Sequence, residues 1–185
     1  MTNGYGATSL KDIAKAADVS TGTLYRYFPS KADLLFRIRR ISLDNLHRVA
    51  EDLPEAMPLV DKLCAVIRED MASVSQGIEL ERATGETDPR VELALAVRSE
   101  SYGSLEQLKQ EHRFQQELQS IYRVLIEHEQ TQGRFDASID AEGLSQTVAA
   151  LYFQAVDEAI LEGGLDVVRA MRPKLETLFR DAACE

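Results

Sequence analysis

Apolar residues recur every three or four positions along most of this chain, the spacing that places them on one side of an α-helix. One clear stripe runs through Leu34, Ile38, Ile41 and Leu46. Only five prolines interrupt 185 residues, and no run alternates apolar with polar residues as a half-buried strand does. The sequence therefore predicts an all-α fold.

Start and stop signals divide the chain into successive helices. Asp88 and Pro89 supply an N-cap and a first-turn proline, and Gly133 can stop a long helix. Pro173 is expected to bend or interrupt the last helix, and the polar residues 76–87 are expected to form a loop. The helices expected after the first 33 residues cover 34–53, 59–74, 89–97, 104–132, 140–162 and 167–178.

Two short helices joined by a tight turn are predicted between residues 8 and 31. Ser9, Ser20 and Ser30 each stand where a side-chain oxygen can cap the first turn of a helix. Asp18 follows the first short helix, where the backbone often takes a left-handed conformation that Asp tolerates. This order of elements is that of a helix-turn-helix, whose second helix can enter the major groove of DNA.

Three apolar side chains are expected to hold this unit together. Val19 can fill the inner side of the turn, and Leu24 and Phe28 are expected in the core. One of the two nearby tyrosines, Tyr25 or Tyr27, could be part of that core as well, because tyrosine is often partly buried.

Charge divides the chain into two expected domains. Residues 1–48 hold eight Lys and Arg against four Asp and Glu, whereas residues 49–185 carry a strong acidic excess within a total of −10. Only the basic end can attract a polyanion, although surface charge also varies between regions without a function. We therefore assign DNA binding to residues 1–48, and ligand binding with dimerisation to residues 49–185.

The start of the second short helix has the residues that base contact requires. Thr21, Gly22 and Thr23 are small, so the backbone can approach the base edges closely. The Thr hydroxyls can donate or accept hydrogen bonds there, and the methyl groups can contact a thymine methyl. Tyr25 and Tyr27 place hydroxyl groups within reach of phosphate.

Two lysines add positive charge to the same region. Lys31 begins the next helix, whose free N–H groups favour an anion. Lys11 lies on the first short helix and could reach a base or a phosphate. Such lysines are ordinary solvated residues by themselves, so their meaning depends on the helix-turn-helix pattern beside them.

The stretches 8–14, 19–28 and 30–35 together resemble the DNA-binding head of the tetracycline-repressor (TetR) family. The resemblance implies an all-helical homodimeric transcription regulator, usually a repressor, that binds a palindromic double-stranded DNA operator. A small-molecule effector bound to the body would release the DNA. Carried over residue by residue, Lys11, Thr21, Gly22 and Thr23 fall at positions that face bases, and Tyr25, Tyr27 and Lys31 fall at phosphate positions.

Two features depart from the family's pattern. Asp18 stands where the family often has Gly, a change that the turn should survive. Gly4 and Tyr5 resemble the pair at the end of the family's first helix, so we expect the first helix of the head to be missing. The alternative to a DNA-binding regulator is therefore a DNA-silent dimer that binds a ligand or a partner.

By the same resemblance, the last two long helices of each chain pair into a four-helix dimer interface. Helical spacing alone is also compatible with stripes that face the chain's own core. The stripes in question are Leu144, Val148 and Leu151 and, in the last helix, Val167, Met171, Leu175 and Leu178.

A cavity for an effector is expected among the helices between residues 58 and 132. Its candidate lining residues are also suited to an ordinary core, and Arg98 or Arg123 could meet an acidic ligand unless both are solvated. The candidate lining residues are Met71, Tyr102, Phe114, Tyr122 and Phe153.

Enzymatic chemistry finds no support in the sequence. A di-metal carboxylate site in a helical bundle needs two Glu-x-x-His motifs, and the nearest approach is Asp44 with His47. No phosphate-binding glycine loop, nucleophile elbow or Cys-His metal pattern occurs. The two cysteines, Cys64 and Cys184, lie far apart, and no stretch is apolar enough to span a membrane. We expect a cytoplasmic protein that is not an enzyme and has no cofactor or metal.

Overall fold

The computed structural model describes residues 5–75, 89–162 and 166–180, and these residues form helices without a strand. The all-α prediction is confirmed. The described helices are α1 (Leu10–Ala16), α2 (Thr21–Tyr27), α3 (Lys31–Asp52), α4 (Leu59–Ser75), α5 (Pro89–Ser101), α6 (Leu105–Thr131), α7 (Ala141–Leu161) and α8 (Val167–Leu178).

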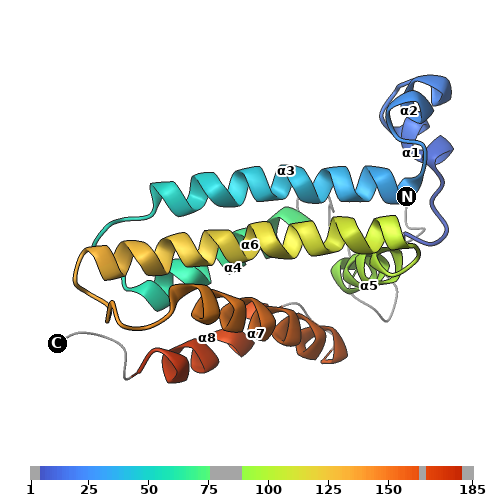
Figure 1. The fold of residues 1–185 in the computed structure, drawn as a ribbon. Helices are drawn as coiled ribbons and strands as arrows, with labels where there is room; N and C mark the ends of the chain where they lie inside the picture. The colour runs from blue at the N-terminus through green and yellow to red at the C-terminus, as the bar shows by residue number, and fades with distance from the viewer. Residues whose placement is uncertain (1–4, 76–88, 163–165, 181–185) are drawn as a thin grey trace.

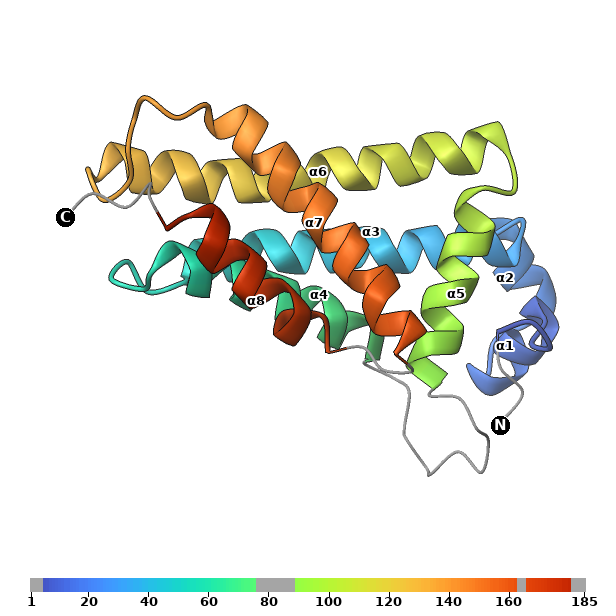
Figure 2. The same ribbon diagram turned by 90° about the horizontal axis from the view of Figure 1, so that it is seen from below.

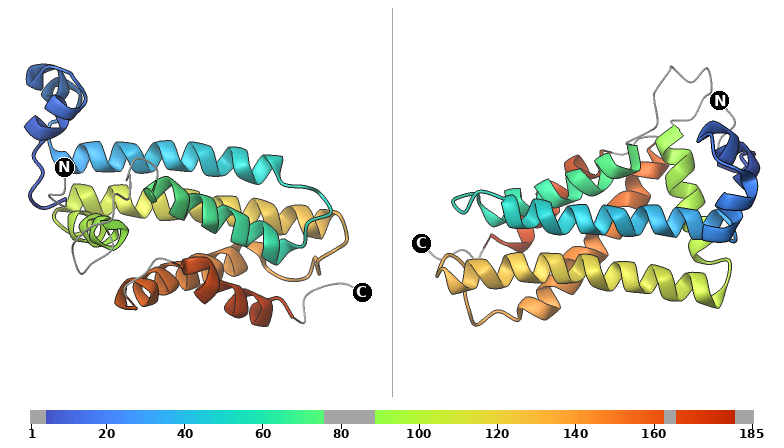
Figure 3. Two further views of the ribbon diagram at one scale, coloured as in Figure 1. Left: turned by 180° about the vertical axis from the view of Figure 1, so that it is seen from behind. Right: turned by 90° about the horizontal axis from the view of Figure 1, so that it is seen from above.

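The helices form a bundle with a small head at one end. α3 and α6 run side by side along the bundle, and α1 and α2 project beyond the first turns of α3 (Figure 1). Seen from below, α7 crosses α6, and α8 lies against α4 and α7 (Figure 2). Views from behind and from above show α1 and α2 clear of α4, α7 and α8 (Figure 3).

The main hydrophobic core lies inside the bundle. Leu46, Leu63, Ile67, Tyr122 and Met171 are all fully buried there, on four different helices. A second group of buried side chains lies outside this cluster and comes from α1 and the first turns of α3. Its members are Leu10, Ala14, Ala32 and Leu35. α3 therefore contributes to the head at its start and to the bundle core further along.

The helix caps predicted at Ser9, Ser20 and Ser30 are confirmed, because a cap depends only on residues a few positions apart. Ser9 and Ser30 each form a capping box with the Asp three residues later. Ser20 caps α2, and Asp140 caps α7. Asp18 adopts the expected left-handed conformation, with a φ of 54°.

The apolar stripe expected to bury α3 is partly wrong. Ile38 and Ile41 are each 52% exposed. The buried side of α3 carries Leu43 and the predicted Leu46 where α4 and α6 pack against it, and Leu35 is buried nearer the head. α3 has apolar residues on more than one face, so spacing alone does not select the buried one.

Two expectations for the later helices also need correction. α5 extends to Ser101 rather than ending at Val97, and α8 continues through Pro173 without interruption. Val167, Met171 and Leu175 are fully buried between α8 and its neighbours α4 and α7, and this packing offsets the cost of an internal proline. The loop 76–87 and Asp88 lie outside the described residues.

Candidate functional site

α2 is the most exposed helix of the head. None of its residues is fully buried, and it packs mainly against α1. Tyr25 is 49% exposed and Tyr27 65% exposed, so neither belongs to a core. Gly22 and Thr23 are also exposed, and Thr21 is half-buried. Five of the seven residues expected to contact DNA therefore lie together on one accessible helix.

The first turn of α2 is fixed by hydrogen bonds from Ser20. The Ser20 hydroxyl accepts from the backbone N–H of Thr23 at 3.0 Å and shares a hydrogen bond with the Thr23 hydroxyl at 2.7 Å. The Thr23 hydroxyl is thus partly used within the protein, while its methyl group stays available for apolar contact.

Gly22 has open space around it. A Cβ atom at this position would meet no atom of the protein within 4 Å. Packing within the chain therefore does not require glycine at this position. A physical reason for glycine here is that it allows a binding partner to approach the backbone closely.

Lys31 connects the start of α3 to the segment before α1. Its ammonium group donates hydrogen bonds to the carbonyl oxygens of Tyr5, at 2.5 Å, and Thr8, at 2.9 Å. It also lies 3.9 Å from the centroid of the Tyr5 ring. Two of its three donors are thus used within the protein, which leaves one for a phosphate.

Tyr5 was not singled out as a functional residue from the sequence. Burial and the nearby carboxylate of Glu100, on α5, both raise the pKa of the Tyr5 hydroxyl. Tyr5 therefore touches the head through Lys31 and approaches the bundle at α5. The Gly4-Tyr5 motif was visible in the sequence, but its partner Glu100 is too distant in the chain to be found there.

The expected core of the helix-turn-helix is more open than predicted. Val19 is 41% exposed instead of filling the inner side of the turn, and Leu24 and Phe28 are only half-buried. The reason is that α2 packs mainly on α1 alone. The expectation that the first helix of the family's head is missing stays an expectation, since residues 1–4 lie outside the described part.

Three cationic side chains lie on α2 or on α1 beside it. Lys11 and Lys15 on α1 are exposed, and Arg26 stacks over the ring of Tyr27 at 5.1 Å. Arg26 was not among the predicted site residues. Its position between Tyr25 and Tyr27, two predicted phosphate contacts, could have indicated it from the sequence.

Four of the five residues expected to line an effector cavity belong to the main core or pack against it, and the fifth, Tyr102, lies on the surface. Tyr102 is 63% exposed, Met71 and Phe153 are half-buried against the main core, and Phe114 is buried. The Tyr122 hydroxyl is buried and lacks a hydrogen-bond partner among the described residues.

A buried carboxylate lies in the same part of the bundle. The Tyr152 hydroxyl donates a hydrogen bond to Asp70, and the Ser42 hydroxyl donates to it at 3.3 Å. Burial raises the pKa of Asp70 and outweighs the opposing effect of these hydrogen bonds. This polar group was missed from the sequence because its members come from three separate helices.

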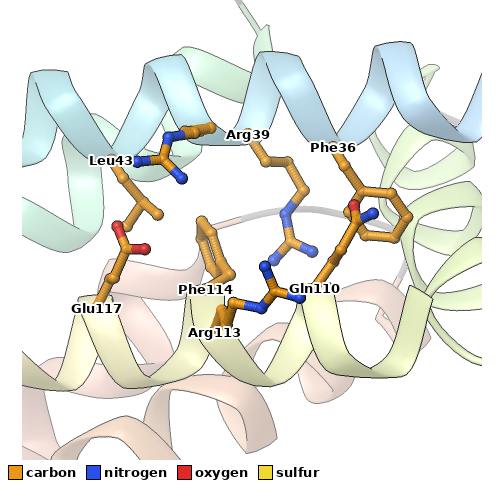
Figure 4. A pocket seen from close by; sticks show the side chains of 8 residues that line it. Phe36, Arg39, Leu43, Gln110, Arg113, Phe114 and Glu117 are labelled. Atoms are coloured by element: carbon orange, nitrogen blue, oxygen red, sulfur yellow. The ribbon is translucent and has the colours of Figure 1, made fainter. Parts of the chain in front are cut away.

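One arginine-rich pocket lies between α3 and α6 (Figure 4). Its volume is about 160 Å³. Of the predicted cavity residues, it contains Phe114. The lining comprises Phe36, Arg39, Arg40 and Leu43 from α3 and Gln110, Arg113, Phe114 and Glu117 from α6.

Taken together, the projecting head and the bundle define an all-helical protein with a helix-turn-helix at its amino end. Residues 1–38 match the profile described as bacterial regulatory proteins of the tetR family. The amino-terminal segment is thus a TetR-family segment, and the resemblance inferred from the sequence is confirmed.

Relatives and solved structures agree with this result. The fatty acid metabolism regulator protein of Bacillus subtilis (strain 168) is 36% identical over 66 residues, which are 35% of this chain and 34% of that protein. The match thus spans about a third of that relative's length. A TetR transcription regulator from Haloarcula marismortui superposes with a TM-score of 0.70 and 16% identity, covering 98% of this chain and 90% of that one.

A second solved structure has the same overall fold. Thermus thermophilus FadR, described as a TetR-family transcriptional repressor in complex with lauroyl-CoA, gives a TM-score of 0.63 with 21% identity. It covers 95% of this chain and 84% of that one. The chain as a whole therefore has the same overall fold as these solved structures. Within the described ranges, no helix is both long and apolar enough to cross a bilayer.

Proposed function

We propose that this protein is a sequence-specific DNA-binding transcription regulator, and that it acts as a repressor. The observation that carries the proposal is the position of α2, which projects from one end of the molecule without a single buried residue. A helix this short and this exposed gains little from packing within the chain. Its exposure is that of a recognition helix in a helix-turn-helix.

The residues of α2 divide into two roles. Thr21, Gly22 and Thr23, at the start of the helix, face the bases in the major groove. Tyr25 and Tyr27, further along, donate to phosphates, and this fixes the position of the helix without reading sequence. The proposal rests on the exposure of these side chains and on the space around Gly22.

The lysines supply the electrostatic part of the binding. Lys11 is exposed on α1 beside the recognition helix and contacts a base or a phosphate. Lys31 holds the head through Tyr5 and Thr8 and offers its third donor to a phosphate. Each phosphate contact by a lysine releases counterions from the DNA, so binding should weaken steeply with added salt.

A second copy of the chain would complete the DNA-binding unit. We assign the dimer interface to α7 and α8, but not to the stripes that the sequence suggested. Val148, Val167, Met171 and Leu175 face the chain's own core. The outer face of α7, with Ala150 and Gln154 exposed, is therefore the proposed seam. Two heads related by a twofold axis would read a palindromic operator.

The dimer has its own test in sedimentation velocity. Ala150→Arg places a long charged side chain in the proposed seam and should shift the protein from dimer to monomer. Gln116→Arg introduces the same residue on the exposed surface of α6 and should leave the mass unchanged. A monomeric parent protein, or equal effects of both variants, would place the seam elsewhere.

The effector is proposed to be an amphipathic acid derivative. A solved structure of the same fold is described in complex with lauroyl-CoA, and a relative of the head is named a fatty acid metabolism regulator. Long-chain acyl-CoA thioesters are therefore the first compounds to test for release of the protein from DNA.

Selection from a random double-stranded DNA library, followed by fluorescence anisotropy with the selected duplex, tests the DNA-binding proposal. Thr21→Val should change the selected sequence, whereas Tyr25→Phe should weaken binding to all duplexes by a similar factor. Lys11→Gln should reduce the slope of log affinity against log salt by about one, and Arg180→Gln, far from the head, should not.

The alternative is a DNA-silent dimer, which the half-buried state of Leu24 and Phe28 favours. Under that alternative, selection would enrich no sequence, and anisotropy would show only weak binding common to all duplexes.

A further inference from the structure

The pocket between α3 and α6 combines guanidinium groups with aromatic rings. The Arg39 guanidinium lies 3.8 Å from the centroid of the Phe114 ring, and the Arg39 side chain is only 15% exposed. Figure 4 shows Arg39 from α3 and Arg113 from α6 pointing toward one another beside Phe114. Two like charges that face each other are stabilised when an anion lies between them.

The charges of the pocket contrast with those of the whole chain, which carries −10. Three arginines line the pocket with one carboxylate, that of Glu117. Arg40 forms no ion pair or hydrogen bond with any residue of the described ranges. Arg113 pairs only with Glu106, at 3.5 Å, and both side chains are more than half exposed. Such an exposed pair contributes little, so Arg40 and Arg113 remain available to a ligand.

Arg39 differs from the other two arginines because it already has a carboxylate partner. It forms an ion pair with Glu111 of α6, whose side chain is 7% exposed. The Ser101 hydroxyl and the Gln115 amide also donate to Glu111, at 2.8 and 3.2 Å. Glu111 therefore keeps two hydrogen bonds if Arg39 turns toward another anion.

We propose that this pocket binds the acidic group, a phosphate or a carboxylate, of an amphipathic ligand. Guanidinium groups match both anions with paired hydrogen bonds, and the pocket offers three of them. Its volume of about 160 Å³ is smaller than that of a site for a complete drug-sized ligand, so it takes the head group. Phe36 and Phe114 provide the surface against which an apolar or aromatic remainder packs.

A ligand in this pocket can affect how the head is held, because the pocket lies on the helix that carries the head. An anion on Arg39 competes with Glu111, and the Arg39–Glu111 pair joins α3 to α6. α3 begins at Lys31, which holds the segment before α1. Occupancy therefore weakens a contact that fixes the helix carrying the head. This step rests on the proposed function, because it makes the occupant the effector of a DNA-binding protein.

Binding is tested without DNA by ¹H–¹⁵N NMR titration at constant ionic strength. The probes are phenyl phosphate, benzoate and, as the neutral arm, benzyl alcohol. The amides of residues 36–43 and 110–117 should shift saturably with phenyl phosphate or benzoate and not with benzyl alcohol. Comparison of the two acids shows whether the site prefers a phosphate or a carboxylate.

A pair of double variants separates the pocket from general electrostatics. Arg40→Gln with Arg113→Gln should weaken binding of the preferred acid at least about tenfold. Arg37→Gln with Arg123→Gln removes the same charge from α3 and α6 outside the pocket and should change binding by less than about twofold. Equal effects of the two pairs, or no saturable shift in the pocket amides, would overturn the site.

The regulatory step has a separate readout. The preferred acid, added at saturation to the protein on its selected duplex, should lower the DNA affinity of the parent protein and not that of the pocket variant. If the acid binds in the pocket and DNA affinity does not change, the occupant is not the effector. If no duplex is selected at all, the proposed function fails, while the titration still decides whether the pocket binds anions.

Discussion

Replacement of Gly22 by alanine tests the assignment of α2 more sharply than loss of a large side chain would. The added methyl group meets no atom of the protein within 4 Å. Alanine is favoured over glycine inside a helix by up to about 1 kcal/mol, so the free energy of unfolding should stay constant or rise. A variant that weakens DNA binding cannot then owe its effect to unfolding.

The effect on DNA follows from the same methyl group. If the start of α2 approaches the base edges closely, a Cβ at Gly22 must push the helix outward and disturb the contacts of Thr21 and Thr23. Loss of the contacts to one base pair costs about 1–3 kcal/mol, so affinity should fall about fivefold or more. Fluorescence anisotropy with the selected duplex measures the affinity, and urea unfolding followed by circular dichroism measures stability.

Gly133→Ala is the matched control, because Gly133 also has no atom near its missing Cβ. Its φ of 70°, however, lies in the left-handed region. Alanine there should lower the free energy of unfolding by about 1 kcal/mol and leave DNA affinity unchanged. Gly22→Ala with the DNA affinity of the parent protein would show that α2 does not approach bases at this point. A loss of stability equal to that of Gly133→Ala would contradict the open space around Gly22.

Three further predictions concern the bundle. Lys62→Met leaves the buried carboxylate of Glu129 with Arg134 as its remaining cation, and the free energy of unfolding by urea should fall by about 3 kcal/mol. Burial raises the pKa of Glu129, but hydrogen bonds from Arg134 and Lys62 outweigh it and hold the pKa below the ordinary 4.5. Its contribution to stability should be present at neutral pH and lost as the pH falls below about 4.5, which urea titrations across that range measure. Asp70 has a raised pKa, so its charged form destabilises the fold at neutral pH. The variant Asp70→Asn should therefore have a higher melting temperature than the parent protein at neutral pH, and this difference should shrink as the pH falls.

The local features of the head could be predicted because each depends on neighbours in the sequence. A cap needs a hydroxyl and an N–H three residues later, as Ser9, Ser20 and Ser30 show. The left-handed turn at Asp18 is likewise a property of one residue and its place after a helix. Such features hold whatever the rest of the chain does.

The buried side of each helix could not be predicted in the same way, because it depends on which helices pack together. Ile41 and Leu43 are both apolar residues of α3, and only the positions of α4 and α6 decide that Leu43 is buried while Ile41 is exposed. The stripe through Met171 was open to a dimer seam or to the chain's own core, and its burial settles the question. Arg39 and Arg113 meet only because α3 and α6 run side by side, which no local pattern contains.

The start of α3 sets the orientation of the head relative to the bundle. α1 and α2 pack mainly on each other, so their orientation relative to the bundle must be set where the head joins α3. At that point the Lys31 ammonium binds two carbonyl oxygens of the preceding segment, and the Ser30 capping box fixes the first turn. These are short polar contacts near the surface, which open more easily than a packed core. A small rotation of α3 can therefore redirect α2 without unfolding either part, as the proposed control of the head by a distant ligand requires.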